Sequence, residues 1–352
     1  MNIALLRMLQ EQPDSHFWPE SLARSLAISP ARLLRDLREL EEFGFGIEHA
    51  PHLGVRYVEP ARRLCVDQIE WQLGTRTIGR RIAVWRRVTS TNDVAARAAK
   101  SPSNDGLVVL SEEQTAGRGR RHRRWHAPPH SSILMSVLIF PPPALRSVAL
   151  LTSLAAIAVA DVLIESLKLP ARIKWPNDVR VASKKCCGIL VEVLTRSRRR
   201  QPSSGRDGDS ARSEHSRDEP PPRPVSWRAA VIGIGINVNV EPRDFPRELA
   251  SPATSLMALC GRRLDRSELA RAVIQRLDLL YDRSRGGSLK MVWDRWRELA
   301  DLVGQPVCVE RPHDELRGRL VDLRPERFVL LQRENGERVR IPTEEVLSIA
   351  EM

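Results

Sequence analysis

The sequence predicts an α+β protein of three parts: a helical N-terminal unit with a hairpin, a larger central unit in which strands and helices alternate, and a small C-terminal β-barrel. Three features lead to this expectation. Residues 1–60 combine helical spacing of apolar residues with one alternating stretch, strand and helix patterns mix from Arg81 onward, and only short strands follow Gly304. A chain of 352 residues is also long for one domain. We place the units at residues 1–62, 63–302 and 303–352.

The N-terminal unit has the pattern of a winged helix-turn-helix. Apolar spacing predicts helices over residues 2–10 and 19–27. Ser29 before Pro30 is an N-cap followed by proline at the first helical position, and the helix that starts there is predicted to end near Gly44. Residues 46–58 alternate like a two-stranded wing. Short helices, a tight turn, a third helix and a hairpin are typical of this DNA-binding motif.

The third helix would be the one that reads DNA. Its candidate DNA contacts are Arg32, Arg35 and Arg38. It also carries acidic side chains, which oppose phosphate: Asp36, Glu39, Glu41 and Glu42. The helix therefore presents both signs of charge.

The central unit begins with a polar connection and continues as an alternating, catalytic-sized unit. Its longest helix is predicted from Arg146 to Lys168, amphipathic and rich in alanine and leucine, with later helices at residues 267–282 and 289–302. Strands are predicted at residues 82–88, 107–111, 133–140, 172–175, 188–194 and 229–240. Residues 196–226 contain almost no apolar side chains, so we expect a disordered insertion between two strands.

The C-terminal unit is predicted to be a small β-barrel. Short strands are expected at residues 307–310, 316–323, 328–333 and 337–341. The turn at residues 334–337, Glu-Asn-Gly-Glu, is a strong hairpin signal.

Composition restricts the cellular setting. The formal net charge of +12 favours anionic partners such as nucleotides, nucleic acid or acidic proteins, without choosing among them. The five cysteines are odd in number and lack metal-ligand spacing, which argues against a disulfide framework and for a reducing compartment. We recognise no signal peptide and no apolar run of membrane-spanning length. We therefore expect a cytoplasmic protein with no metal site built by its own ligands and no membrane partner.

Residues 114–125, Gln-Thr-Ala-Gly-Arg-Gly-Arg-Arg-His-Arg-Arg-Trp, form a predicted loop that is suited to phosphate. Its glycines permit close backbone approach, and its arginines supply forked donors that are always charged. Arg118, Arg120 and Arg121 are therefore candidates for binding a phosphorylated ligand. Such a loop would bind nucleic acid as readily, and a plain solvated charge run is a third interpretation.

Two lysines stand near predicted strand ends, where side chains can point into a shared cleft. Lys174 opens the segment Lys-Trp-Pro-Asn-Asp, and Lys185 precedes the strand that starts at Gly188. A lysine in an apolar cleft is unfavourable unless it meets an anion. Taken alone, without the neighbouring motifs, either lysine is better explained as a surface charge.

Residues 231–240 predict a strand with one apolar face and one bare face. With period two, isoleucine and valine share the first face, and the second presents Gly233, Gly235, Asn237 and Asn239. Bare backbone indicates that something flat lies against it, or that a neighbouring helix packs closely.

Residues 89–93, Thr-Ser-Thr-Asn-Asp, precede an alanine-rich helix. Small hydroxyl and amide side chains at this position cap a helix, and they can also bind a polar group of a ligand.

In this order and spacing, the segments resemble the biotin–protein ligase family, most closely its bifunctional bacterial type that also acts as a biotin repressor. The shared pattern is Ser90-Thr91-Asn92, Gly117-Arg118-Gly119-Arg120-Arg121, Lys174-Trp175-Pro176-Asn177-Asp178, Gly188-Ile189-Leu190-Val191-Glu192 and Gly235-Ile236-Asn237. The resemblance covers nearly the whole chain. It implies a winged helix-turn-helix, a mixed-sheet catalytic domain like that of class II aminoacyl-tRNA synthetases, and an SH3-like barrel.

The resemblance also implies the site. Biotin would be bound by Ser90, Thr91, Asn92, Gln114, Gly119, Arg120, Arg121, Lys185, Gly188, Gly233 and Gly235. ATP or the adenylate would be bound by Arg118, Arg120, Arg121, Trp125, Lys174, Asn177 and Asn237, with Trp125 covering the nucleotide. The implied catalytic residues are Lys185, Arg118, Arg120 and Asp178, the last as an aid to deprotonation of the acceptor lysine.

The chain departs from the family pattern at a few positions. His122 stands where glycine is common in the loop. Cys186 and Cys187 replace an apolar and a small residue, and we expect them to pack rather than react.

The implied activity joins biotin to ATP as biotinyl-5′-AMP, with Mg²⁺, and transfers the biotin to a lysine of the apo biotin carboxyl carrier protein of acetyl-CoA carboxylase. Operator DNA and a second copy of the chain, as a homodimer, are further partners that the resemblance suggests. Two related alternatives stay open: a lipoate–protein ligase and a DNA-binding repressor with a decayed ligase. A basic nucleic-acid-binding protein without catalysis is a third, although the aromatic content of 5% is low for binding single strands.

Overall fold

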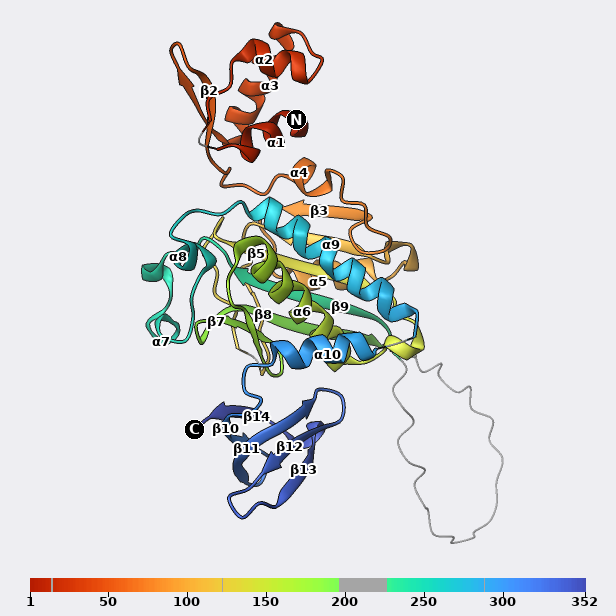
Figure 1. The fold of residues 1–352 in the computed structure, drawn as a ribbon. Helices are drawn as coiled ribbons and strands as arrows, with labels where there is room; N and C mark the ends of the chain where they lie inside the picture. The colour runs from red at the N-terminus through yellow and green to blue at the C-terminus, as the bar shows by residue number, and fades with distance from the viewer. Residues whose placement is uncertain (14, 122, 196–226, 288) are drawn as a thin grey trace, which may run out of the picture.

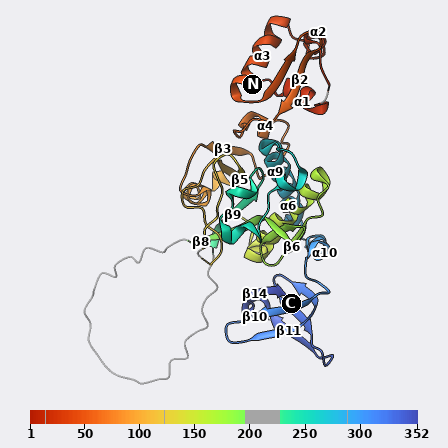
Figure 2. The same cartoon turned by 90° about the vertical axis from the view of Figure 1, so that its left-hand side faces the viewer.

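The computed structural model describes residues 1–13, 15–121, 123–195, 227–287 and 289–352. The predicted insertion at residues 196–226 and the departure at His122 lie outside the described residues. The described chain forms an N-terminal unit, a central part built on a seven-stranded sheet, and a C-terminal five-stranded sheet. Two views at right angles place the N- and C-terminal units at opposite ends of the central part (Figures 1 and 2).

The N-terminal unit contains the three helices and the hairpin that the sequence predicts. They are α1 (Ile3–Glu11), α2 (Pro19–Ser25), α3 (Pro30–Phe43), β1 (Gly46–Ala50) and β2 (Gly54–Glu59). The Ser29 hydroxyl accepts the amide N–H of Arg32, and Gly44 ends α3 in a left-handed conformation with φ 112°. Apolar side chains of the helices and hairpin form a hydrophobic cluster of their own.

The central sheet is mixed, as expected. Its first two strands, β3 and β4, run parallel, and every other neighbouring pair is antiparallel. In spatial order the strands are β3 (Arg81–Trp85), β4 (Leu107–Ser111), β5 (Ser132–Ile139), β9 (Trp227–Asn237), β8 (Lys184–Thr195), β7 (Asp178–Val181) and β6 (Arg172–Lys174). The strand β8 begins at Lys184, so the predicted start at Gly188 was too late.

Helices cover both faces of this sheet. Three lie on one face, α6 (Val148–Leu167), α9 (Arg266–Arg285) and α10 (Lys290–Leu299), and α5 (Thr91–Ala98) lies on the other. The prediction that the longest helix is amphipathic was wrong, because α6 packs between the sheet and the helices α9 and α10. By length and composition α6 could cross a membrane, but 78% of its most apolar window is buried inside the protein.

The C-terminal sheet is antiparallel throughout. Its spatial order is β13 (Arg338–Pro342), β12 (Phe328–Gln332), β11 (Glu315–Arg324), β10 (Pro306–Glu310) and β14 (Ser348–Glu351). The predicted Asn335-Gly336 turn joins β12 to β13, with Gly336 at φ 85°. The strand β14 was not predicted; it has four residues and pairs with β10, about forty residues earlier in the chain.

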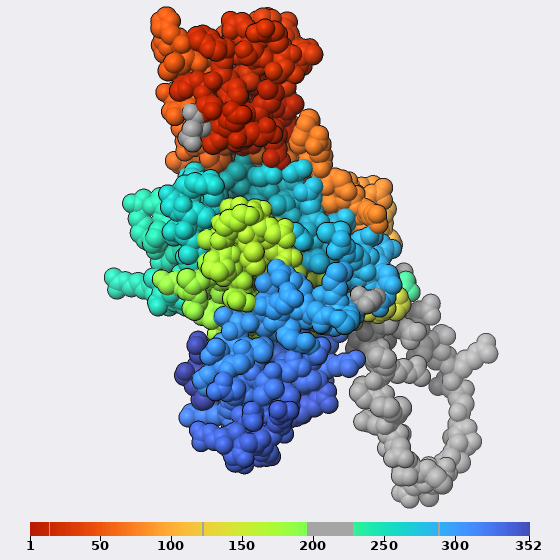
Figure 3. All heavy atoms as spheres, in the orientation of Figure 1, coloured from red at the N-terminus to blue at the C-terminus, as the bar shows by residue number. Residues whose placement is uncertain are grey.

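Short elements complete the central part: α4 (Val66–Glu70), α7 (Arg247–Ala250) and α8 (Leu256–Cys260). The helix α4 follows the chain segment that leaves the N-terminal unit. In the space-filling view the N-terminal unit sits directly on the central part, and the C-terminal sheet packs against its other end (Figure 3). The C-terminal sheet shares one continuous hydrophobic cluster with the central part.

Candidate functional site

The predicted site residues of the central unit meet in one cleft of about 510 Å³. The cleft lies beside α5 and is bordered by the ends of β6–β9 and by the segment between β4 and β5, whose described residues, 113–121 and 123–129, we call the arginine loop. Arg118, Lys185 and Gly235 share this cavity, although they come from three separate segments. All the residues proposed above for biotin, ATP and catalysis line it, whereas the three arginines of α3 do not.

The floor of the cleft is the bare backbone of β8 and β9. A Cβ atom added at Gly235 would lie 2.6 Å from the Trp125 ring, and one at Gly188 would lie 2.9 Å from it. At Gly233 an added Cβ would lie 2.5 Å from Oδ1 of Asn92, a residue of α5. Both predicted reasons for a bare face are therefore present: a flat ring lies on one part of the floor and a helix side chain on another.

A buried hydrogen-bond network lines the α5 wall of the cleft. Ser90 caps the helix, as one interpretation of the sequence held. The Gln114 Oε1 accepts from the amide and the hydroxyl of Thr91, at 2.7 and 2.9 Å. Ser136 donates to Asn92 Oδ1 at 2.5 Å, and Asn92 Nδ2 donates to Glu192 Oε2 at 2.6 Å. Glu192 and Ser136 had no assigned role in the sequence, because strand partners far apart in the chain reveal such contacts only when folded.

Arg118 is anchored by two carboxylates at the base of the arginine loop. Its Nη2 lies 2.7 Å from Asp93 Oδ1 and 3.2 Å from Glu192 Oε2. The hydrogen bond from Arg118 holds the pKa of Asp93 below its usual value, so the pair is charged at neutral pH. In this conformation Arg118 fixes the loop against α5 and β8 rather than offering free positive charge.

Lys185 stands at the start of β8 and meets an anion from β7. Its Nζ lies 2.7 Å from Asp178 Oδ1, and it also sits 5.7 Å from the centroid of the Trp125 ring. Lys185 therefore lines the cleft, and the anion beside it in this structure is a protein carboxylate.

The cleft is strongly cationic. Its positively charged lining residues are Arg118, Arg120, Arg121, Arg123, Arg124, Arg180, Lys174 and Lys185, and Asp178 is the single carboxylate among the described lining residues. Arg120 has no ion-pair partner in the described part of the chain; desolvation and the charge of Arg121 lower its pKa. Arg121 instead donates to the backbone carbonyl of Leu347, at 2.6 Å, next to β14.

Two buried polar atoms in the cleft lack partners among the described residues. They are Oδ1 of Asn237 and Nε1 of Trp125. The Asn237 amide nitrogen, in contrast, donates to the carbonyl of Thr254, and that of Asn177 donates to the carbonyl of Ile189. A buried polar atom is costly unless a ligand or water satisfies it, so Asn237 and Trp125 offer one acceptor and one donor to a ligand.

Several features near the cleft do not indicate thiol chemistry or a metal site built by the protein. Burial raises the pKa of the Cys186 thiol to about 12 and that of Cys187 well above its usual value, so both remain protonated and packed. No cluster of three or more metal-ligating side chains occurs in the described ranges. Residues of β14, from Ser348 to Ala350, also line the cleft, which the sequence did not indicate.

Comparison with known proteins shows which family this chain is similar to. The sequence profile of the biotin/lipoate A/B protein ligase family matches residues 84–209. A biotin–[acetyl-CoA-carboxylase] ligase of Mycobacterium tuberculosis is 30% identical over 238 residues, which are 66% of this chain and 76% of that protein. The chain belongs to the biotin protein ligase family.

The similarity to this family extends beyond the cleft. The bifunctional ligase/repressor BirA of Bacillus subtilis is 27% identical over 339 residues, 94% of either chain. Among solved structures, a biotin protein ligase from Aquifex aeolicus in complex with biotin and ATP shares the fold, with a TM-score of 0.61 at 24% identity; the match covers 78% of this chain and all of that one.

Proposed function

We propose that this chain is an ATP-dependent biotin–protein ligase that forms biotinyl-5′-AMP and then biotinylates a lysine of the biotin carboxyl carrier protein. One observation carries the proposal: the arginine loop, Lys185 and the glycine floor of β8 and β9 border a single cleft. A cationic cavity with a flat, bare floor suits a carboxylate held against a nucleoside phosphate.

In the first step, the biotin carboxylate attacks the α-phosphate of ATP and pyrophosphate leaves. Two anions must approach, so fixed positive charge is the main requirement. Arg120, which is unpaired among the described residues, and Lys185, which can exchange Asp178 for the ligand, would supply that charge. Arg118 would act from the loop base, where its two carboxylate contacts fix the approach of the loop.

The biotin end would be held by the α5 wall. Ser90, Thr91, Asn92 and Gln114 present hydroxyl and amide groups there, and Trp125 with its neighbouring glycines provides a flat apolar surface. Trp125 would shift from the floor to cover the nucleotide as ligands enter. The free oxygen of Asn237, together with Lys174 and Asn177, would face the nucleotide.

In the second step, the acceptor lysine attacks the mixed anhydride and AMP leaves. The anhydride hydrolyses readily, so a loop that closes over it protects it from water. Asp178 lies in the cleft 2.7 Å from Lys185 and would accept the proton from the incoming lysine once Lys185 turns to the ligand.

Mg²⁺ is the metal that this chemistry implies. The described residues offer Asp178 alone as a carboxylate in the cleft, which fits an ion carried mainly by the phosphates of ATP rather than by a protein cage. Bound there, the ion would neutralise phosphate charge.

We also propose the finer assignment of the three units: a winged helix-turn-helix at residues 1–62, a class II synthetase-like ligase domain at residues 63–302 and an SH3-like barrel at residues 303–352. The element order of each unit supports it. A cytoplasmic setting and a homodimer through the core sheet belong to the same proposal, and the exposed Trp85 on the edge strand β3 is compatible with such a contact. Sedimentation equilibrium measures the oligomeric state.

The ligase proposal is tested by incubating the protein with biotin, MgATP and an apo carrier domain, and weighing the carrier. A mass increase by one biotinyl group is expected. Replacing biotin by lipoate, or adding lipoate as a competitor, separates the two ligases; preferential lipoylation would overturn the assignment. ATP–pyrophosphate exchange without biotin-dependent stimulation would instead indicate a decayed ligase.

Repression is a second candidate function, favoured by one observation. Arg35 and Arg38 are exposed on α3 and make no ion pair within the described ranges, whereas Arg32 is paired with Asp36 at 2.7 Å. Free arginines on the third helix suit contacts to DNA phosphates.

A further inference from the structure

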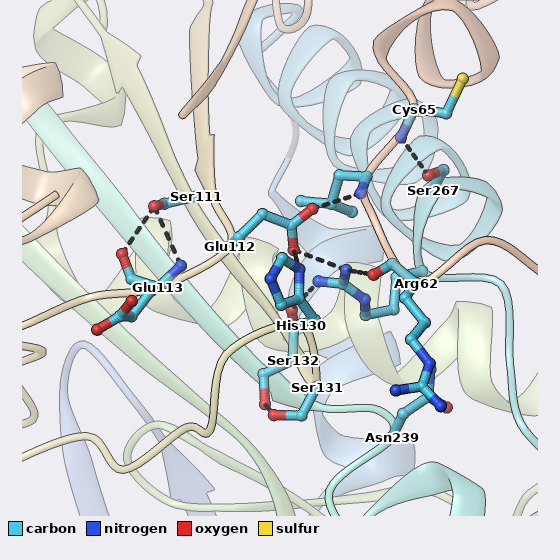
Figure 4. A network of polar contacts seen from close by, with 12 residues as sticks. Arg62, Cys65, Ser111, Glu112, Glu113, His130, Ser131, Ser132, Asn239 and Ser267 are labelled. Atoms are coloured by element: carbon cyan, nitrogen blue, oxygen red, sulfur yellow. Dashed lines mark hydrogen bonds and ion pairs between the residues drawn. The ribbon is translucent and has the colours of Figure 1, made fainter. Parts of the chain in front are cut away.

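A buried ion pair outside the cleft joins the arginine loop to the chain segment that leaves the N-terminal unit. The pair is Glu112 with Arg266, whose carboxylate and guanidinium lie 2.7 Å apart with 7% and 2% of their side chains exposed. Glu112 directly follows β4, and Arg266 begins α9. Figure 4 shows the carboxylate of Glu112 near the centre of the cluster, with the ring of His130 directly below it and Arg62 farther to the right. Neither residue belongs to the cleft lining.

The pair holds both ends of the arginine loop. The loop leaves from Glu112 and returns at His130, whose amide donates to the carbonyl of Glu112 at 3.2 Å. The His130 ring nitrogen Nδ1 lies 3.3 Å from the same carboxylate. Arg266 adds a hydrogen bond of 2.9 Å to the carbonyl of Ser132, where β5 begins. The two ends of the loop are therefore fixed to one carboxylate and one guanidinium.

The same two side chains hold the connection, which we define as residues 60–65 between β2 and α4. The amide of Leu64 donates to the Glu112 carboxylate, and Arg266 donates to the carbonyl of Arg62. Next to them, the amide of Cys65 donates to the Ser267 hydroxyl at 2.9 Å (Figure 4). The arginine side chains of the connection are exposed, whereas its backbone polar groups bond to side chains inside the protein.

The start of α9 also contacts the N-terminal unit itself. Gln10 of α1 donates to Asp265 at 3.1 Å, and Arg7 pairs with Glu268 at 2.6 Å. Arg266 lies between these two acidic residues and points inward to Glu112. The N-terminal unit and the base of the arginine loop therefore contact neighbouring residues at the start of α9.

We propose that Glu112 and Arg266 are positioning residues that couple closure of the arginine loop over the adenylate to docking of the connection and the N-terminal unit. The inference rests on the proposed ligase function. The same carboxylate and guanidinium hold both loop ends and the backbone of residues 62–64, so a shift of the loop ends as the loop closes on the adenylate is transmitted to the connection. Coupling between two sites is reciprocal, so a loosened connection also weakens retention of the adenylate.

The test compares wild type with the double variant Glu112→Gln/Arg266→Met in the full-length protein. Removing one partner alone leaves a buried, uncompensated charge, whereas the double change removes both charges and favours a folded protein. Two quantities are measured: the dissociation rate of biotinyl-5′-AMP, and hydrogen exchange in the peptide that covers residues 60–66. We expect release to speed up about tenfold, a usual size for coupling between sites, and exchange in the connection to rise in the same variant.

The matched control is Asp161→Asn. Asp161 is also a buried carboxylate, 5% exposed, and it pairs with Arg295 and Arg276 in the helical layer, away from the loop and the connection. Its variant should lower the melting temperature but leave adenylate release and exchange at residues 60–66 unchanged. The coupling is refuted if the control moves both quantities equally, or if the double variant changes only one. Adenylate formation by the wild type reports the ligase function separately, because a wild type that makes no adenylate contradicts that function and not the contacts of the pair.

Discussion

Lys185 is the single residue on which the proposed first step depends most directly. It lies in the cleft, 2.7 Å from Asp178, and no other lysine stands at the start of β8 except its neighbour Lys184, which is exposed. Lys185→Ala should reduce adenylate formation by about 10²–10³-fold, the usual effect of losing one preorganised charge. Pyrophosphate release measures it. Lys184→Ala is the control and should retain wild-type speed; normal release from Lys185→Ala would remove this residue from the mechanism.

Arg120 should matter more for keeping the adenylate than for the fold. Its guanidinium reaches the cleft without an ion-pair partner among the described residues, so it is available to phosphate. Arg120→Gly should speed release of biotinyl-5′-AMP by about 10- to 100-fold, the equivalent of one charged hydrogen bond, with an unchanged melting temperature. Arg120→Lys retains the charge, so its release rate should lie between those of the wild type and of Arg120→Gly. Equal release rates in all three proteins would contradict the assignment.

At this scale the residues that the motifs and the family resemblance name come together in one cleft, while their roles there stay a prediction. Gly, Arg and Lys at motif spacing all reached one cleft. The residues that hold them could not be found in this way. Glu192 and Ser136 are ordinary strand residues until folding brings them to Asn92, and Glu112 meets Arg266 only across 154 positions of the chain. Contacts between distant segments leave no periodic signal in a single sequence.

At the scale of elements, the paired strands β8 and β9 determine the shape of the floor. Gly235→Ala should cost about 1–3 kcal/mol of biotin affinity, as for an overpacked site, because the new methyl group would fill part of the floor on which the ligand would lie, 2.6 Å from the present position of the Trp125 ring. Isothermal titration with biotin measures the loss. Ile232→Val, on the opposite and buried face of the same strand, is the control.

The two changes should separate binding from stability. Ile232→Val should lower the unfolding free energy by about 0.5–1.5 kcal/mol and leave biotin affinity unchanged. Gly235→Ala should lower biotin affinity and leave the unfolding free energy nearly unchanged. If both variants lose affinity equally, the floor is not a specific contact surface.

Elements were predictable where a periodic pattern and a terminal signal agreed. The helix α3 is an example, since Ser29, Pro30 and Gly44 mark its ends. The sequence misjudged α6 because an alanine- and leucine-rich helix reads as amphipathic until its neighbours α9 and α10 are placed on its outer side. It missed β14 because four residues carry too little pattern, although their place beside the cleft makes them part of the site.

At the scale of the whole molecule, the ligase cleft and the third helix of the N-terminal unit are separate cationic surfaces. The net charge of +12 is therefore not a property of one site. DNA binding, if it depends on phosphate contacts from α3, should weaken with salt, with a slope set by the number of contacts. The rate of carrier biotinylation should not show the same salt dependence, because that reaction takes place in the cleft.

The variant Arg35→Gln/Arg38→Gln tests this separation. Both arginines are exposed and unpaired within the described part of the chain, so each can neutralise one phosphate. Losing two such contacts should reduce the slope of log K against log [salt] by about 2, measured by fluorescence anisotropy with duplex DNA, while biotinylation of the carrier stays at wild-type rate. Arg32→Gln is the matched control on the same helix: its guanidinium is held by Asp36 at 2.7 Å, so the slope should change little. An unaltered slope in the double variant would mean that α3 is not the surface that meets DNA, and the acidic residues of that helix would then explain why.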